Sequence, residues 1–142
     1  MANPPFAAYP ALTHEEILYR VLKNRDYADK GKPFAFLLGK HEVDSGLSVA
    51  FNCTSDQAEA VFESTFGSVS LVASKTAQID GLGGSKLAVI PDSPTHANIT
   101  NIPHKDDYPT DALRIAEALA AISDEVIVRE RRKFWPQPLA QP

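Results

Sequence analysis

Polar side chains able to bind a ligand or do chemistry concentrate in two short segments, residues 46–51 and 96–102. His96 opens the second segment, HANITNI, and an imidazole can donate a hydrogen bond, accept one or titrate near neutral pH. Side chains alternate between two faces in an extended chain, so His96 and Asn98 would share one face. Ser48 takes a polar position in the same way in GLSVAF. If the two segments are neighbouring strands, one sheet face is polar. Such a face is either an ordinary solvated surface or a ligand cleft.

A pair of histidines is the second kind of site that this region suggests. His96 and His104, with the aspartates that follow His104, supply ligand types that bind zinc. Their spacing matches no common ligand pattern, and the chain has one cysteine. Pro103 ends an extended segment before His104, so alternation cannot carry that far. We therefore expect no metal site, and we expect His104 to lie in a loop apart from His96.

The element before these segments, residues 13–23, is ambiguous. Thr13 and Glu16 have the spacing of a capping box, which indicates a helix start. The run ILYRVL is β-branched and aromatic enough for a strand. We favour a short helical entry that runs into an extended segment at 18–21.

The remaining pattern predicts several short strands and two main helices. Gly67 would end the first helix and Thr110 would cap the second. Residues after the second helix either continue it or form a strand. The expected strands are 34–38, 46–51, 68–73, 86–90 and 96–102, and the expected helices are 55–66 and 110–126. This order predicts one α+β domain with a mixed or antiparallel sheet of about five to six short strands.

Length and composition favour one compact domain in a reducing, cytoplasmic setting. The chain has 142 residues and a single cysteine, which cannot form an internal disulfide. It contains no apolar run near the ~18 residues that span a bilayer, and its N-terminus lacks the pattern of a signal peptide. Prolines gather at both ends. We expect a proline-rich arm at 1–12, a domain at 13–128 and a basic, proline-rich arm at 129–142.

The C-terminal arm carries the clearest cluster of cations in a chain whose net charge is −4. An acidic body repels nucleic acid, so nucleic-acid contact is expected only through this cluster. Binding of a partner protein by the arm is the simpler interpretation. The cationic residues are Arg129, Arg131, Arg132 and Lys133.

Three short elements suggest a family resemblance. LYRV (18–21), GLSVAF (46–51) and HANI (96–99) occur together, followed by an alanine-rich helix. The chain thus resembles a family of small, uncharacterised bacterial proteins with L-x-R, G-L-S-V and H-A-x-I elements. The resemblance covers most of the chain and implies no particular activity.

A looser resemblance concerns the order of elements. An arginine in the first strand, a serine in the next strand pair, a DQAEAVF helix and an SVSLV strand follow one another. This layout is similar to that of ADP-ribosyltransferase-like folds, including RES-type domains. The resemblance implies that Arg20 and Ser48 contact NAD. The family has a glutamate in a late strand, where this chain has His96.

These observations lead to two functional hypotheses. The first is a small soluble accessory or binding domain that needs no cofactor, because the sequence yields no complete catalytic constellation. It would recognise a partner protein or a small polar ligand through the polar sheet face. The alternative is an ADP-ribosyltransferase-like enzyme that uses NAD, without contact with a membrane in either case. The candidate ligand-binding residues are Arg20, Ser48, His96 and Asn98.

Overall fold

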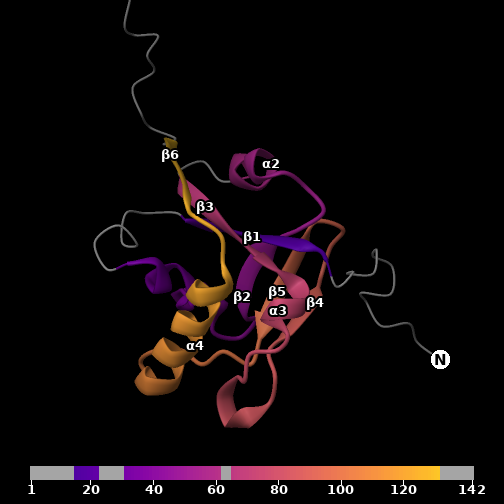
Figure 1. The fold of residues 1–142 in the computed structure, drawn as a ribbon. Coiled ribbons are helices and arrows are strands. Elements are labelled where there is room, and N and C mark those ends of the chain that lie inside the picture. The colour runs from indigo at the N-terminus through magenta and orange to yellow at the C-terminus, as the bar shows by residue number, and fades with distance from the viewer. Residues whose placement is uncertain (1–14, 23–30, 62–64, 132–142) are drawn as a thin grey trace, which may run out of the picture.

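The computed structural model describes residues 15–22, 31–61 and 65–131, which form one six-stranded sheet with helices packed against it (Figure 1). The strand order is β4-β5-β2-β1-β3-β6, and every neighbouring pair is antiparallel. The predicted α+β class is thereby confirmed, and of the two sheet types that the sequence left open, mixed or antiparallel, the sheet is antiparallel. The strands are β1 (Ile17–Leu22), β2 (Leu47–Ala50), β3 (Thr65–Val72), β4 (Ala88–Pro91), β5 (His96–Thr100) and β6 (Ile127–Arg131); the α-helices are α2 (Ser55–Ala60), α3 (Ala73–Thr76) and α4 (Pro109–Ile122).

The ambiguous early segment is a strand, β1, near the middle of the sheet. It pairs with β3 over its whole length and with β2 at Tyr19 opposite Ala50. A central strand gains backbone hydrogen bonds on two sides, which favours the extended form of its β-branched and aromatic residues. The expected capping residue, Thr13, lies outside the described residues.

The predicted alternation in β2 and β5 is confirmed. Leu47 and Val49 are buried on β2, and Ala97 and Ile99 are buried on β5. The residues between them are half-buried and lie on the opposite face. The buried side chains join one core, to which α4 contributes Ile115, Ala116 and Leu119.

The two faces of the sheet have different cover. Helix α4 and the core lie against one face. Helix α2 lies against the other, where its Glu59 accepts a 2.6 Å hydrogen bond from the hydroxyl of Ser68 on β3. Val69, the next residue of β3, points into the core. Figure 1 shows α2 and α4 on opposite sides of the strands. The half-buried side chains of β2 and β5, which alternate with the core residues, lie on the same face as α2.

The strand expected at 34–38 is wrong. Residues Lys32–Phe36 form a 3₁₀ helix, η2, with a proline in its first turn. Proline fixes φ near the helical value and suits the start of a helical turn. A second short 3₁₀ helix, η3 (Lys40–Glu42), follows.

The predicted end of the first helix is also wrong. Thr54 caps α2 as expected, by accepting a hydrogen bond from the backbone N–H of Gln57 at 3.1 Å. Gly67, however, lies inside β3 rather than after the helix. Its φ is +149°, and a Cβ there would lie 1.9 Å from the carbonyl oxygen of Ile127 on β6. The glycine is therefore required for the close approach of two strands.

The beginning of α4 differs slightly from the prediction. Its first helical residue is Pro109 and its N-cap is Tyr108, so Thr110 lies within the first turn. Proline is well suited to the first helical position because it needs no partner for an N–H. The chain then leaves α4 and becomes a strand, β6, which settles the alternative that the sequence left open.

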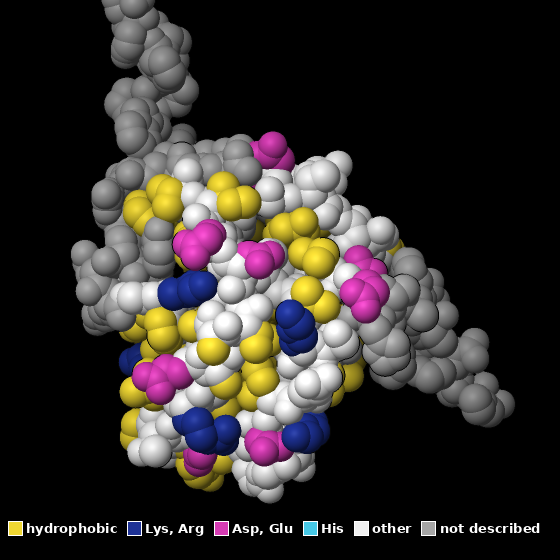
Figure 2. Space-filling model, in the orientation of Figure 1, with side chains coloured by type: hydrophobic (Ala, Val, Ile, Leu, Met, Phe, Trp, Pro, Cys, Tyr) yellow, Lys and Arg dark blue, Asp and Glu magenta, His cyan; other side chains and the backbone are white. Residues whose placement is uncertain are grey.

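Strand β6 extends the sheet into the segment expected to be an arm, as far as Arg131. The side chains of the basic cluster and the two terminal segments lie outside the described residues. Within the described part of the chain, no helix has the length and apolar character needed to cross a membrane. On the face drawn in Figure 2, cations and carboxylates are interspersed, and no described histidine is visible.

Candidate functional site

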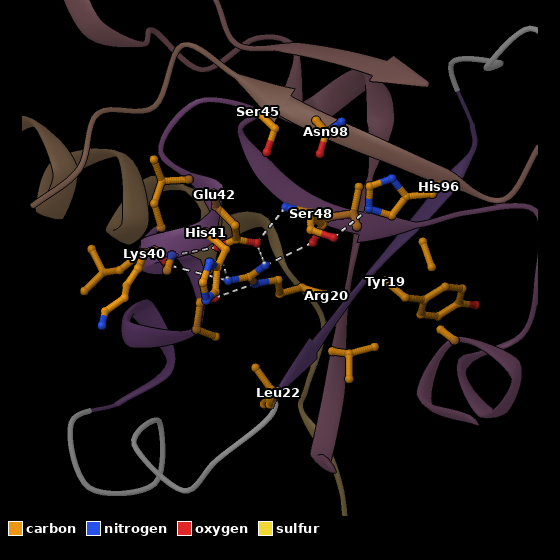
Figure 3. Close-up of a pocket in the computed structure, with 18 of the residues that line it drawn as sticks. Tyr19, Arg20, Leu22, Lys40, His41, Glu42, Ser45, Ser48, His96 and Asn98 are labelled. Atoms are coloured by element: carbon orange, nitrogen blue, oxygen red, sulfur yellow. Dashed lines mark hydrogen bonds and ion pairs between the residues drawn. The ribbon is translucent and has the colours of Figure 1, made fainter. Parts of the chain in front are cut away.

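A pocket of about 990 Å³ lies beside β1, β2 and β5, with residues from η2 and η3 forming another wall. All four candidate residues from the sequence, Arg20, Ser48, His96 and Asn98, line it (Figure 3). They come from three strands, and the antiparallel register places Ser48 directly opposite Asn98 and Ala50 opposite His96. Ser48, His96 and Asn98 share one sheet face, so the structure brings these three predicted side chains together. Arg20 lies opposite Val69 on the core face and contacts Ser48 only through its backbone carbonyl. The function of all four residues remains a prediction.

Ser48 lies where the backbone pairing between β1 and β2 has stopped. Continuing the register of Tyr19 and Ala50 would place Val21 opposite Ser48, but the two strands pair only at Tyr19. The backbone groups of Ser48 instead bind side chains. Its N–H donates to Glu42 Oε2 at 2.9 Å, and its carbonyl accepts from Arg20 Nη1 at 3.1 Å. An ion pair thus replaces the backbone hydrogen bonds where the strands separate.

Arg20 uses all five of its N–H donors within the protein. Nε donates to the carbonyl of Ala35, and the two terminal nitrogens donate to the carbonyls of Leu37 and Ser48 and to both carboxylate oxygens of Glu42. The carbonyls of Ala35 and Leu37 face Arg20 because this segment is η2 and its end rather than a strand. Arg20 is therefore a brace between β1, β2 and η2, and it keeps no donor for a ligand.

Glu42 is equally well bound. Oε1 accepts hydrogen bonds from Gly39 N at 2.7 Å and from Arg20, and Oε2 accepts from Ser48 N and from Arg20. Both side chains of the pair are 14% exposed. Burial by itself raises the pKa of Glu42. The hydrogen bonds and charge of Arg20, helped by the two backbone N–H groups, outweigh burial and lower the pKa.

The side chain of Ser48 belongs to a different group. Its Oγ lies 2.6 Å from His96 Nε2, and His96 Nδ1 lies 2.6 Å from Asp92 Oδ1. The other carboxylate oxygen of Asp92 accepts a hydrogen bond from Asn98 Nδ2 at 3.0 Å. Serine, imidazole and carboxylate therefore form a continuous chain along one side of the pocket.

The β4–β5 connection positions this chain. The backbone N–H groups of Asp92 and Ser93 donate to the carbonyl of His96 at 3.0 and 3.3 Å, which closes a tight turn. The turn holds the Asp92 carboxylate beside the imidazole four residues later. Ser48 reaches the same imidazole from β2 because Ala50, two residues away, is the partner of His96.

The arrangement determines which imidazole nitrogen carries the proton. An ionised carboxylate can only accept hydrogen bonds, so Nδ1 of His96 must donate to Asp92. In the neutral imidazole, Nε2 then has a lone pair and accepts the hydroxyl proton of Ser48. His96 is thus oriented as a base toward Ser48.

The rest of the pocket wall is mainly apolar, with a balanced set of charges. Among its charged side chains, Lys40 and Lys105 are matched by Asp92 and Asp106, in addition to the pair of Arg20 and Glu42. The apolar lining includes Tyr19, Val21, Leu22, Phe34, Leu37, Leu38, Val49 and Val61.

His104 lies in the loop before α4, as expected from Pro103. Its Nδ1 accepts a hydrogen bond from the backbone N–H of Asp106 at 3.1 Å, and the residue also lines the pocket. The described residues include no group of three histidine, cysteine or carboxylate side chains placed to hold a metal ion.

Two site residues were missed in the sequence. Asp92 lies four residues before His96 in a proline-flanked turn, and this short spacing was a usable signal. Glu42 lies in what looked like a simple connection, and its pairing with Arg20, 22 residues earlier, has no local signature.

Comparisons with protein-family models, with curated proteins and with solved structures found no match to this chain.

Proposed function

We propose that this protein binds a small polar ligand in the pocket beside β1, β2 and β5. The observation that carries the proposal is the convergence of Ser48, His96, Asp92 and Asn98 on one side of a largely apolar pocket of about 990 Å³. Small-molecule sites combine a mainly apolar lining with a few well-placed polar groups, in volumes of about 300–1,000 Å³. The polar group would orient the ligand, and the apolar wall would hold its carbon skeleton.

The charge balance of the pocket narrows the class of ligand. Its lysines and aspartates are equal in number, and Arg20 and Glu42 neutralise each other. Such a pocket favours an uncharged or zwitterionic compound over a polyanion. The compound would carry hydroxyl, amide or amine groups that replace the hydroxyl of Ser48 at the imidazole.

The alternative of an NAD-using enzyme makes a different demand on Arg20. Contact of Arg20 with a phosphate of NAD would require it to give up hydrogen bonds to Glu42 or to backbone carbonyls. Breaking a buried ion pair is costly, so we favour the neutral ligand. NAD is the natural comparison compound for the test.

The test is a ligand-observed NMR screen of neutral and zwitterionic metabolites, with NAD and related nucleotides included, followed by calorimetry of the hits. Binding should fall at least about fivefold in His96→Ala, since one good hydrogen bond contributes about 1 kcal/mol or more. The melting temperature of this variant should change little, because the side chain of His96 is 38% exposed.

Ser70→Ala is the matched control. Ser70 shares the sheet face of Tyr19, its partner across the strands, but its hydroxyl donates to Asp124 and does not line the pocket. The Ser70→Ala variant should bind every hit with the same affinity as the wild type. Hits that bind His96→Ala with unchanged affinity would contradict the proposal, and tight binding of NAD alone would favour the alternative.

A further inference from the structure

We propose that Ser48 is a nucleophile, activated by His96 and oriented through Asp92, and that it accepts an acyl group from a carboxylic ester. The proposal goes beyond ligand binding, although it uses the same pocket. Its basis is the order of atoms: Ser48 Oγ to His96 Nε2 at 2.6 Å, then His96 Nδ1 to Asp92 Oδ1 at 2.6 Å.

This order is what nucleophilic catalysis by serine requires. A serine hydroxyl is a poor nucleophile unless a neighbouring base takes its proton, and an imidazole within 2.6–3.2 Å is such a base. A carboxylate on the other nitrogen holds the imidazole in the correct tautomer and stabilises it when it becomes charged. Three residues from β2, β5 and the β4–β5 turn meet these requirements together.

Asn98 strengthens the assignment. Its amide donates to the second oxygen of Asp92 at 3.0 Å, so both carboxylate oxygens are fixed. Asp92 and Asn98 are therefore positioning residues that act through His96. Ser48 and His96 are the groups that would contact the reacting atoms.

The chemical step is acyl transfer to Ser48 followed by hydrolysis. Ser48 Oγ bonds to the carbonyl carbon of the ester while its proton passes to His96 Nε2. The bond from that carbon to the alcohol oxygen breaks, and the alcohol leaves with the proton. Water then attacks the acyl-serine, again losing a proton to His96, and that proton returns to Ser48 Oγ as the carboxylic acid leaves.

The pocket suggests the kind of ester and the rate of its turnover. The apolar wall, including Phe34, Leu38 and Val61, suits an apolar acyl or alcohol group. The backbone N–H of Ser48 already donates to Glu42, so it cannot stabilise the developing oxyanion. Ser45 also lines the pocket, and its hydroxyl is a donor by type. Both acylation and hydrolysis pass through an oxyanion, so we expect both steps to be slow.

The direct test is covalent labelling of the full chain with an alkyl fluorophosphonate, followed by intact and peptide mass spectrometry. In this reaction Ser48 Oγ bonds to phosphorus, fluoride leaves and the hydroxyl proton passes to His96. The expected result is one label per chain, located on Ser48. It should be absent in Ser48→Ala and unchanged in Ser70→Ala. Labelling should be at least about 10²-fold slower in His96→Asn, the effect of removing a general base.

Asp92→Asn tests the positioning role. It should slow labelling and also change the ¹⁵N chemical shifts of the His96 ring, because the amide no longer requires a proton on Nδ1. An effect on structure alone would leave the tautomer unchanged. Each variant is first checked for native NMR dispersion, and His96→Gln replaces His96→Asn if the latter does not fold.

The outcomes separate this proposal from ligand binding. Labelling needs no natural ligand, so it can succeed even if the metabolite screen finds none. Wild-type protein that does not react, a label on another residue, or an equal rate in folded His96→Asn overturns the nucleophile. A wild-type rate and ring signature in Asp92→Asn overturns the assignment of Asp92. Hits in the screen without labelling would leave a binding pocket with no nucleophile.

Discussion

Two polar groups meet at Ser48, and they differ in burial and in how fully their atoms are used. Arg20 and Glu42 bind the backbone of Ser48, are each 14% exposed and satisfy all their polar atoms within the protein. His96 and Asp92 continue from its side chain and are 38% and 52% exposed. The buried group holds the strands and η2 together. The group of His96 and Asp92 faces a pocket, where a ligand can take the place of the Ser48 hydroxyl at the imidazole. Residue type alone did not distinguish the two roles.

The sharpest way to test this comparison is to remove one carboxylate from each group. Glu42→Ala leaves Arg20 charged and unpaired in a mostly buried place, and loss of one partner of a buried pair costs about 3–5 kcal/mol. Asp92→Ala should cost about 1 kcal/mol or less, because its pair with His96 is half open to solvent. Urea unfolding measures both. Equal losses would show that the two groups do not differ as described.

A control variant tests whether the loss in Glu42→Ala comes from the unpaired charge. Replacing both partners, in Arg20→Met with Glu42→Leu, should recover much of the lost free energy of unfolding, as apolar replacements of buried pairs do elsewhere. The backbone of Ser48 would still lack its two side-chain partners, so recovery should be incomplete.

Lowering the pH should weaken the pair of Arg20 and Glu42. The direction of this change in stability follows from the pKa of Glu42. Its folded pKa lies below the ordinary value of a glutamate because of its bonds to Arg20 and to two backbone N–H groups. Glu42 therefore contributes its full stabilisation above that value and loses it as pH falls through the folded pKa. Wild-type protein should lose more stability between about pH 5 and pH 3 than Glu42→Gln. Parallel pH curves for the two proteins would contradict the role given to Glu42.

The smallest expected effects are the losses of stability in variants of two serines on the same sheet face. Ser48→Ala and Ser70→Ala each remove one side-chain hydrogen bond, to His96 and to Asp124, and each should cost about 0.5–1.5 kcal/mol. Similar thermal denaturation curves with labelling lost only in Ser48→Ala would separate function from stability. A much larger loss in Ser48→Ala would show that its hydroxyl is mainly structural.

The sequence predicted the parts of this site that depend on local pattern. Alternation of apolar and polar residues was enough to place Ser48, and likewise His96 and Asn98, on the strand face away from the core, because side chains in a strand alternate whatever surrounds it. The alanine-rich helix α4 was equally clear from its periodicity. The α+β class followed from the order of such elements.

Local pattern failed where contact between distant segments decides the conformation. Phe34 to Leu38 looked like a strand, but a proline turn and packing against α4 make most of it helical. Gly67 looked like a helix end, but it serves the close approach of β6. In each case the competing structure depends on residues far along the chain.

The sequence by itself therefore determined which side chains share a strand face, since that depends only on the geometry of an extended backbone. Only the tertiary structure decided their partners. Strand order placed β2 between β1 and β5, so that Ser48 meets Arg20 and Glu42 through its backbone and His96 through its side chain. Such pairings depend on how distant strands are ordered and registered in one sheet, and packing of the whole core sets that order.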